Sequence, residues 1–278
     1  MAPAESYFLK YLKIAPFSHA LWRGVEAQII ADACKEIANL PKKKSTNNSF
    51  NFKKPVLDVG CGFGEFSGIF FDSQVEVGVD ISTDDLIRAR QTKKYKKLFV
   101  TDARNMSFPD NIFSTVICIS VIEHISKPEL VLKEIYRVLK SGGFFILTVP
   151  TIVLNDNLFY PQLFTKIGLK GMAKWYITNF HKVFKHVNLF STKKWVSLTT
   201  KSGLKIMTVQ KKFPKFLTVL FDIALIFALP SQVTRWLFGK RAIWGGSVKL
   251  FILNKIYLQV LKDKNMTDSN ILIIAQKP

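Results

Sequence analysis

A short apolar run that ends in an acid and continues into three alternating glycines is the feature that most constrains this chain. It spans Val56–Phe66, where Asp58 precedes Gly60, Gly62 and Gly64. Glycine tolerates positive φ angles and lets a ligand approach the backbone closely, because it has no Cβ. We therefore expect a strand, a tight turn and a helix start. Open α/β sheets present their strand ends to nucleotide-like ligands in this way.

Strand and helix patterns alternate regularly between residues 55 and 150. Strands are predicted at Val56–Val59, Val75–Asp80, Leu98–Thr101, Thr115–Ile119 and Phe144–Val149. Helices are predicted at Glu65–Phe71, Thr83–Gln91 and Pro128–Leu139, and Lys140–Gly143 is expected to cap the last of them. This alternation indicates an α/β fold in which a parallel sheet lies between two helical layers.

The chain is expected to comprise five segments. Residues 1–54 are predicted to form a helical cap, with an amphipathic helix at His19–Leu40, and a linker; residues 55–150 form the ligand-binding core. Residues 151–210 continue from the core and carry a helix at Thr192–Ser202 and a sixth strand at Leu204–Gln210. Residues 211–269 are a helical insertion, predicted to pack on the ligand end of the sheet as a lid or a membrane-facing element. Residues 270–278 hold the final strand, Ile271–Ala275.

Three acids stand at or just beyond successive predicted strand ends, at equal intervals of 22 residues: Asp58, Asp80 and Asp102. In a parallel sheet they converge on one edge, beside the glycine turn. Asp80 can accept hydrogen bonds from both ribose hydroxyls, and Asp102 can accept one from an adenine amine. Asp58 would repel a pyrophosphate but suits a cationic ligand part, which favours S-adenosylmethionine over a nicotinamide dinucleotide.

Four ordered motifs carry a resemblance to a known family: Val56–Phe66; Gly78–Ser82; Thr101–Ala103 with Ser107–Pro109; and Ser120–Ile125 with Leu139–Gly143. Together they resemble the class I S-adenosylmethionine-dependent methyltransferases, and most closely the branch of quinone-type and other small-molecule methyltransferases. The resemblance implies a Rossmann-like, three-layer αβα fold with a seven-stranded sheet. Its last strand runs antiparallel, between the fifth and the sixth. The chain departs from the family pattern at Ser114, where Asp is usual, and at Ser141, where Pro is usual.

The resemblance also implies a set of cofactor-binding residues: Asp58, Gly60, Cys61, Gly62, Gly64, Asp80, Ile81, Asp102, Ala103 and Ser120. The glycine turn would wrap the methionine part of S-adenosylmethionine. Asp58 and the carbonyl of Ser120 would hold its amino group. Asp80 would bind the ribose and Ile81 would lie against the adenine, whose edge would meet Asp102 and the following backbone.

A catalytic base is needed only if the methyl acceptor must lose a proton, because methyl transfer is an in-line displacement. Alignment of the reactants and exclusion of water can contribute about 7–11 kcal/mol. His124, just past the fourth predicted strand, is the candidate base; the alternative is that it packs the following loop together with Glu123. His181 and His186 are candidates for an acceptor pocket, with ordinary packing or surface roles as the alternative. Cys34, Cys61 and Cys118 have no metal-ligand spacing, so no metal is expected, and their odd number indicates a reducing compartment.

Basic residues are concentrated in the second half of the chain. The formal charge is +20, but residues 1–150 carry 20 basic and 16 acidic side chains, and residues 151–278 carry 20 and only 4. Lysines flank apolar runs at Phe213–Leu229 and Val248–Leu261. This pattern is typical of protein segments that bind an anionic membrane surface. The longest run, Phe216–Leu229, contains Asp222 and is shorter than the roughly 20 residues of a membrane span.

These patterns predict a cytoplasmic methyltransferase, peripheral on the inner face of the membrane, that acts on a hydrophobic or lipid-linked acceptor. One alternative is a soluble small metabolite with the insertion as a lid; another is a membrane-associated, non-catalytic cofactor-binding protein. Nucleic acid is disfavoured as the methyl acceptor. No Asn-Pro-Pro-Tyr-like tetrapeptide, typical of enzymes that methylate amino groups of nucleic acids, follows the fourth strand. Cys118 lies within that strand and not at its end, where a thiol that attacks cytosine would be expected. The acceptor atom and the oligomeric state stay open at this point.

Overall fold

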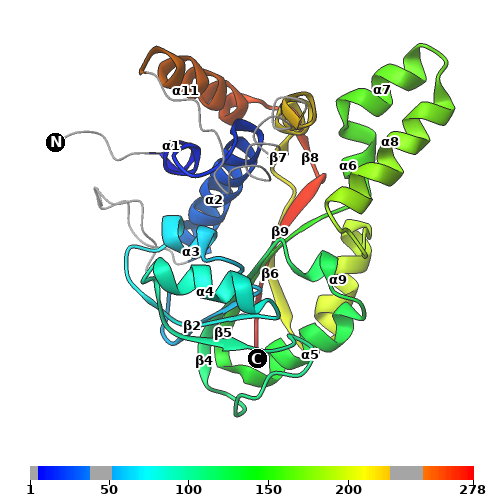
Figure 1. The fold of residues 1–278 in the computed structure, drawn as a ribbon. Helices are drawn as coiled ribbons and strands as arrows, with labels where there is room; N and C mark the ends of the chain where they lie inside the picture. Colours follow the sequence, from blue (N-terminus) through cyan, green and yellow to red (C-terminus); the bar gives the residue numbers. More distant parts are fainter. Residues whose placement is uncertain (1–5, 38–51, 226–246) are drawn as a thin grey trace. The chain divides into compact units, whose positions relative to one another are not determined.

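A computed structural model describes residues 6–37, 52–225 and 247–278 (Figure 1). The chain divides into two compact units. We call the first the helical unit; it contains the described residues before 49 together with Val153–Val183 and Lys212–Ser269. The second, the core unit, contains Ser49–Ile152, Phe184–Lys211 and Asn270–Pro278. Both units are therefore built from segments that are distant in the sequence.

The core unit is organised by a seven-stranded sheet in the order β3-β2-β1-β4-β5-β9-β6. Its strands are β1 (Val56–Val59), β2 (Val75–Asp80), β3 (Tyr95–Val100), β4 (Phe113–Ile119), β5 (Leu139–Pro150), β6 (Lys205–Gln210) and β9 (Asn270–Gln276). β1 to β5 pair in parallel, and β9 pairs antiparallel with both β5 and β6. The expected position and direction of the last strand are thus confirmed. The uninterrupted apolar run Ile271–Ala275 suits this place because the strand is buried along this whole stretch.

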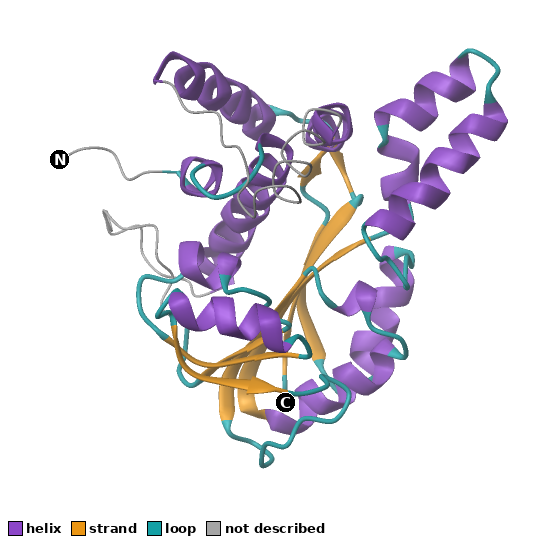
Figure 2. Cartoon of the chain, viewed as in Figure 1, coloured by secondary structure: helices purple, strands orange, loops and turns teal. Residues whose placement is uncertain are grey.

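Helices flank the sheet of the core unit (Figure 2). They are α3 (Glu65–Phe70), α4 (Thr83–Gln91), the short 3-10 helix η1 (Ile122–His124), α5 (Pro128–Val138) and α9 (Thr192–Lys201). Ser82 Oγ caps α4 by accepting a hydrogen bond from the Asp85 amide. The apolar stripe of α5 packs with Trp195 of α9 into the same core as the central strands. This packing gives the strand ends a rigid support.

The link between α5 and β5 differs from the prediction. Helix α5 ends at Val138 and β5 begins at once, so the idea that Lys140–Gly143 caps the helix is wrong. The segment forms an irregularity within β5, where the pairing with β4 shifts after Leu139. Gly142, at φ 73°, donates a 2.8 Å hydrogen bond from its amide to the Lys277 carbonyl. Pairing with the chain end, a contact between distant residues, therefore draws these glycines into the sheet.

The helical unit has its own apolar core. It contains α1 (Tyr7–Leu12), α2 (Phe17–Ile37), α6 (Val153–Asn157), α7 (Phe159–Lys166), α8 (Lys170–Val183), a helix over 215–225, α11 (Ser247–Lys262) and the strand pair β7 (Phe213–Pro214) and β8 (Met266–Thr267). Phe8 of α1 stacks on Tyr257 of α11 with ring centroids 4.8 Å apart. A Cβ on Gly24 would lie 2.7 Å from the Phe8 Cα, so glycine permits the close crossing of α1 and α2.

The predicted helix at His19–Leu40 corresponds to α2, although Leu40 and the Lys42–Lys44 run lie outside the described residues. The described parts of the predicted insertion are mainly helical, which confirms that expectation; residues 226–246 lie outside the description. Among the described helices, none combines the length and apolar character needed to cross a bilayer.

Candidate functional site

The glycine turn after β1 adopts the backbone that its sequence predicts. The φ angles are 71° at Gly60, 51° at Gly62 and 79° at Gly64. These values lie in the left-handed region, which residues with a Cβ rarely adopt. At Gly60 space is limiting as well, because a Cβ would lie 2.2 Å from a methyl of Val121. Gly64 is the residue from which α3 starts. The turn therefore passes close beneath the chain that leaves β4.

Asp80 joins this turn to the end of β2. Its Oδ2 accepts a 2.8 Å hydrogen bond from the Gly62 amide, and its Oδ1 accepts a 2.9 Å bond from the Ser82 amide. Each carboxylate oxygen can accept more than one hydrogen bond, so Asp80 keeps acceptor capacity for a ligand. The carboxylate is thus held in one orientation at the carboxyl edge of the sheet.

A cavity of about 530 Å³ opens at this edge of the core unit. Apart from Lys185, which precedes α9, its lining is drawn from the ends of β1 to β4 and the segments after them: Gly60, Val79, Asp80, Ile81, Ser82, Asp85, Thr101, Asp102, Ala103, Arg104, Ser120, Val121, His124, Ile125 and Ser126. Its volume falls in the range of small-molecule sites, about 300–1,000 Å³. Ile81 is 70% exposed, an apolar surface that a flat ring can cover. Ser120 sits at φ 52°, in the left-handed region that few non-glycine residues adopt.

Asp102 lies in the cavity wall, but its carboxylate is paired. Arg104 Nη2 lies 2.6 Å from Oδ2, Arg104 Nε contacts both oxygens at 3.0 and 3.1 Å, and the Arg104 amide donates to Oδ1. These hydrogen bonds lower the pKa of Asp102. Arg104 Nη1 also donates to Ser126 Oγ at 2.9 Å. Sequence reasoning missed Arg104, and the Asp-x-Arg spacing was the only signal for it.

Asp58 does not line the cavity. It is 4% exposed, and its Oδ2 accepts hydrogen bonds from Ser67 Oγ at 2.6 Å and from the Tyr95 hydroxyl at 2.7 Å. Burial, followed by the charge of Asp58, raises the pKa of Tyr95 well above its ordinary value, so this hydroxyl stays a donor. The acid therefore supports the turn from its buried side. Cys61, Gly62 and Gly64 are likewise outside the cavity lining, and burial raises the pKa of the Cys61 thiol strongly.

His124 is oriented by the backbone. Its Nδ1 lies 3.0 Å from the carbonyl oxygen of Lys185. A carbonyl only accepts hydrogen bonds, so Nδ1 carries the proton and Nε2 is the basic nitrogen. The ring stacks on His186 at a centroid distance of 5.5 Å, and 37% of the side chain is exposed. The contact with Lys185 therefore places the proton on Nδ1, and Nε2 lies 3.7 Å from Glu123 Oε1.

The other two predicted histidines lie elsewhere. Neither His181 nor His186 is among the residues that line the 530 Å³ cavity. His181 belongs to the helical unit, where its Nε2 lies 2.6 Å from Asn155 Oδ1. Burial lowers the pKa of His181, which favours the neutral imidazole. His186 stacks on the ring of His124.

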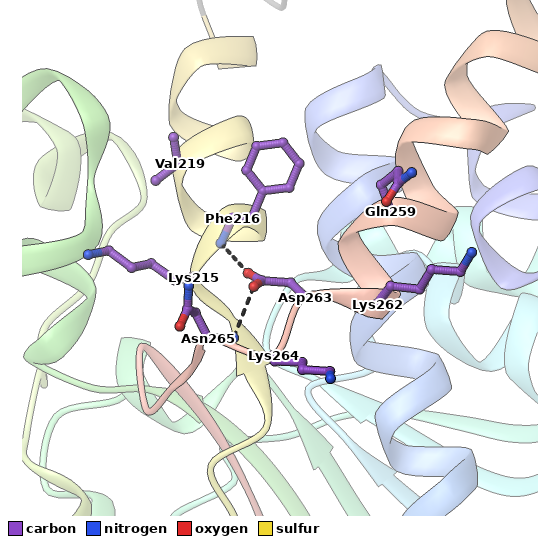
Figure 3. A pocket seen from close by; sticks show the side chains of 8 residues that line it. All are labelled: Lys215, Phe216, Val219, Gln259, Lys262, Asp263, Lys264 and Asn265. Atoms are coloured by element: carbon purple, nitrogen blue, oxygen red, sulfur yellow. Dashed lines mark hydrogen bonds between the residues drawn. The ribbon is translucent and has the colours of Figure 1, made fainter.

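A second hollow, of about 510 Å³, lies in the helical unit between the start of the helix over 215–225 and the end of α11 (Figure 3). Three lysines and an exposed phenylalanine are among the residues that line it: Lys215, Lys262, Lys264 and Phe216. The acid in its wall, Asp263, accepts hydrogen bonds from the amides of Phe216 and Asn265 at 3.0 and 2.9 Å. The hollow is basic and partly apolar. Asp263 is the one acid among the described residues that line it, whereas Asp80, Asp85 and Asp102 line the core cavity.

Comparisons with known proteins show which family the core unit resembles. Residues 57–147 match the family described as methyltransferase domain. Phosphatidylethanolamine N-methyltransferase of Cereibacter sphaeroides is 34% identical over 94 residues, covering 32% of this chain and 46% of that protein. Demethylmenaquinone methyltransferase of Symbiobacterium thermophilum is 36% identical over 102 residues, covering 33% and 40%. A tRNA (carboxymethyluridine(34)-5-O)-methyltransferase of Arabidopsis thaliana is 29% identical over 145 residues, covering 50% and 34%.

The chain spans less than half the length of each of these three relatives. Among solved structures, a Thermotoga maritima protein described as an S-adenosylmethionine-dependent methyltransferase, possible histamine N-methyltransferase, superposes with a TM-score of 0.51. That match has 20% identity and covers 89% of this chain and 87% of the other. At this identity the likeness concerns the fold. Over residues 57–147 this chain therefore carries a methyltransferase domain of the class I fold, whose cofactor is S-adenosylmethionine.

Proposed function

We propose that the whole chain is an S-adenosylmethionine-dependent methyltransferase that acts on a hydrophobic or lipid-linked acceptor at a membrane surface. The observation that carries the catalytic part is the position of Asp80. Its two oxygens are held by the Gly62 and Ser82 amides at the edge of a 530 Å³ cavity, beside a turn in which three glycines have positive φ. A cavity so built suits a ligand with a ribose and a compact cationic end.

The fit of the cofactor rests on the described side chains. When bound, S-adenosylmethionine supplies an electrophilic methyl group on a positively charged sulfur. In our proposal Asp80 accepts hydrogen bonds from the ribose hydroxyls, and Ile81 and Ala103 cover the adenine. The turn from Gly60 to Gly64 leaves room for the methionine part, and the Ser120 carbonyl accepts from its amino group. Asp58, buried behind the turn, contributes negative charge and rigidity rather than a direct contact.

Asp102 needs a modified role. Arg104 occupies much of its carboxylate, so an adenine amine would share the remaining acceptor positions. The pair also places a planar guanidinium in the cavity wall. We therefore assign Asp102 and Arg104 together to the adenine end, with Arg104 keeping the carboxylate ionised and oriented.

His124 is the proposed general base for an acceptor that must lose a proton. Because Nδ1 donates to the Lys185 carbonyl, Nε2 is the nitrogen that can accept that proton. The acceptor's lone pair would then form the new bond to the methyl carbon as the bond from carbon to sulfur breaks, and the proton would end on Nε2. Such proton transfer contributes typically 10²- to 10⁴-fold to the rate.

The hydrophobic acceptor and the membrane are supported by the second half of the chain. Its 20 basic and 4 acidic residues are interleaved with long apolar runs, and the hollow of the helical unit is itself basic and apolar. Relatives named for phosphatidylethanolamine and demethylmenaquinone agree with this acceptor class, whereas the relative named for a tRNA does not. A cytoplasmic location, peripheral on the inner face of the membrane, would follow from this function.

Two measurements test the proposal. Isothermal titration with S-adenosylmethionine should give a binding isotherm, and absence of binding at millimolar ligand would end the enzyme hypothesis. A cell extract incubated with the protein and methyl-labelled cofactor should then yield label in the organic phase. Label confined to the aqueous phase would replace the lipid acceptor by a soluble metabolite. Binding of cofactor with no labelled product from any extract would favour a non-catalytic protein.

A further inference from the structure

Helices α7 and α8 form a hairpin whose turn is closed by backbone hydrogen bonds (Figure 1). The Ile167 amide donates to the Leu163 carbonyl at 3.1 Å, and the Leu169 amide donates to the Phe164 carbonyl at 2.7 Å. Gly168 between them has a φ of 85°, which glycine adopts without strain. The turn that joins the two helices is thus a defined structure.

The inner side of this hairpin is anchored within the helical unit. Ala173 and Phe180 of α8 are buried, and Phe180 packs edge-to-face on Phe221 of the helix over 215–225. Asp222 of that helix accepts hydrogen bonds from the Tyr176 hydroxyl and from the Tyr160 amide, the latter at 3.0 Å. One buried carboxylate therefore binds both helices of the hairpin.

The turn and the outer side of the hairpin expose large apolar side chains. Trp175 is 63% exposed and Ile167 59%, and three further residues are also exposed: Leu163, Leu169 and Met172. Exposed tryptophan next to exposed aliphatic side chains is typical of the interface between a bilayer and water, where the ring is partly buried and its N–H stays solvated.

The charges of the hairpin all have one sign. Lys166, Lys170, Lys174 and Lys182 are exposed, and Phe159–Val183 contains no acidic residue. The sequence has no Asp or Glu anywhere between Asp156 and Asp222. Lysines bracket the exposed apolar residues at the turn, so a surface that covers the turn also meets several positive charges.

We propose that the α7–α8 hairpin inserts its turn and Trp175 into the interface of an anionic bilayer, with its lysines on the lipid headgroups. The exposed aliphatic side chains around Trp175 favour lipid over nucleic acid, because they offer neither hydrogen bonds nor stacking to a base, and the lysines require that the lipid be anionic. This inference deepens the proposed function and rests on its membrane part. It moves the membrane contact from the predicted 211–269 insertion to a hairpin that precedes it.

Sedimentation of the full chain with vesicles tests the proposal. Wild type should bind vesicles of phosphatidylcholine mixed with phosphatidylserine and should not bind phosphatidylcholine alone. Each lysine near an anionic surface contributes about 1 kcal/mol, so K166Q/K170Q/K174Q should bind on the order of 100-fold more weakly. The matched control K193Q/K201Q/K205Q removes the same charge from exposed positions on α9 and β6 and should bind like wild type.

Tryptophan fluorescence identifies the inserted segment. Brominated lipid in the anionic vesicles should quench wild type, and W175F should sediment nearly as well but lose most of this quenching. Equal weakening of binding by the two lysine triples, or unchanged quenching in W175F, would overturn the hairpin as the contact.

Failure of the wider proposal has a different signature. If wild type binds no vesicle at all, both the hairpin inference and the membrane part of the function are wrong. The methyltransferase part is read separately, because titration with S-adenosylmethionine uses no lipid. The hairpin variants should bind the cofactor as wild type does, and they thereby report on their own folding.

Discussion

The Gly62 amide donates a 2.8 Å hydrogen bond to Oδ2 of Asp80, so the turn after β1 and the acid that ends β2 form one unit. The ligand-binding edge of the sheet is therefore organised before any ligand arrives. Loss of either partner should disturb both the turn and the proposed ribose contact.

Replacement of Asp80 by Ala should weaken the binding of S-adenosylmethionine by on the order of 10- to 100-fold. The reason is that hydrogen bonds to a charged group contribute about 1.5–3 kcal/mol. Isothermal titration measures the change. Asp84→Ala is the matched control, because this exposed acid lies in the first turn of α4, a few residues after Asp80, but does not line the cavity. If the two variants bind equally well, Asp80 does not contact the ribose.

Three glycine-to-alanine variants should give a graded series in thermal or urea unfolding. Gly60→Ala combines positive φ with a 2.2 Å approach to Val121 and should cost roughly 2–5 kcal/mol. Gly62→Ala has positive φ but open space around its Cβ, and should cost about 1–2 kcal/mol. Gly68→Ala lies within α3 with open space and should stabilise by about 0.5–1 kcal/mol. A different order would contradict the assigned roles of space and backbone conformation.

His124→Gln should lower kcat by roughly 10²- to 10⁴-fold while leaving the affinity for S-adenosylmethionine unchanged, because the base acts only in the chemical step. His186→Gln removes the stacked neighbour, keeps His124 in place, and should have a much smaller effect. The pH dependence of kcat should lose one ionisation in His124→Gln. Unchanged turnover would mean that His124 packs the loop and takes no proton.

Glu134 should make the core unit sensitive to acid. Hydrogen bonds from Arg137 lower its pKa, and its Oε2 also accepts the Met106 amide at 2.7 Å, which holds the segment after Asp102. Because the folded pKa lies below the unfolded value of roughly 4.3, the stabilisation is present above that pH and is lost as the pH falls through the folded pKa. Glu134→Gln should therefore lower Tm at pH 7 and reduce the further loss of stability on acidification. Glu129→Gln, exposed on the same helix, should do neither.

Tyr176→Phe should destabilise the helical unit by about 1–3 kcal/mol at neutral pH, because it removes a donor from the buried carboxylate of Asp222. Burial raises the pKa of Asp222, so its ionisation costs stability as the pH rises through the folded pKa. The variant increases that cost, and its destabilisation should therefore be larger at neutral pH than below pH 4. Tyr160→Phe is the control, since Tyr160 meets Asp222 through its amide. Equal effects of the two changes would show that ring packing, rather than the hydroxyl, matters.

Local sequence patterns were sufficient to predict most strands and helices of the core unit. The glycine turn required positive φ angles, the apolar run Ile271–Ala275 required a fully buried strand, and Asp80 stands at a strand end as its spacing predicts. They failed where a distant segment competes. Lys140–Gly143 has the composition of a helix cap but pairs with the chain end at Lys277, and β3 begins at Tyr95, three residues before the predicted start.

The sequence alone indicated the kind of fold and the methyl donor, because the glycine turn and the acids at the strand ends are local patterns whose order along residues 56–143 resembles a known family. Tertiary structure decided which of the predicted side chains face the cavity. Asp58 accepts hydrogen bonds from Ser67 and Tyr95, and Asp102 pairs with Arg104. The Lys185 carbonyl determines which nitrogen of His124 carries the proton. Ser67, Tyr95 and Lys185 are each many residues away in the sequence from the side chain that they contact. Hydrogen-bond satisfaction among distant groups is a property of the folded chain, and no local pattern encodes it.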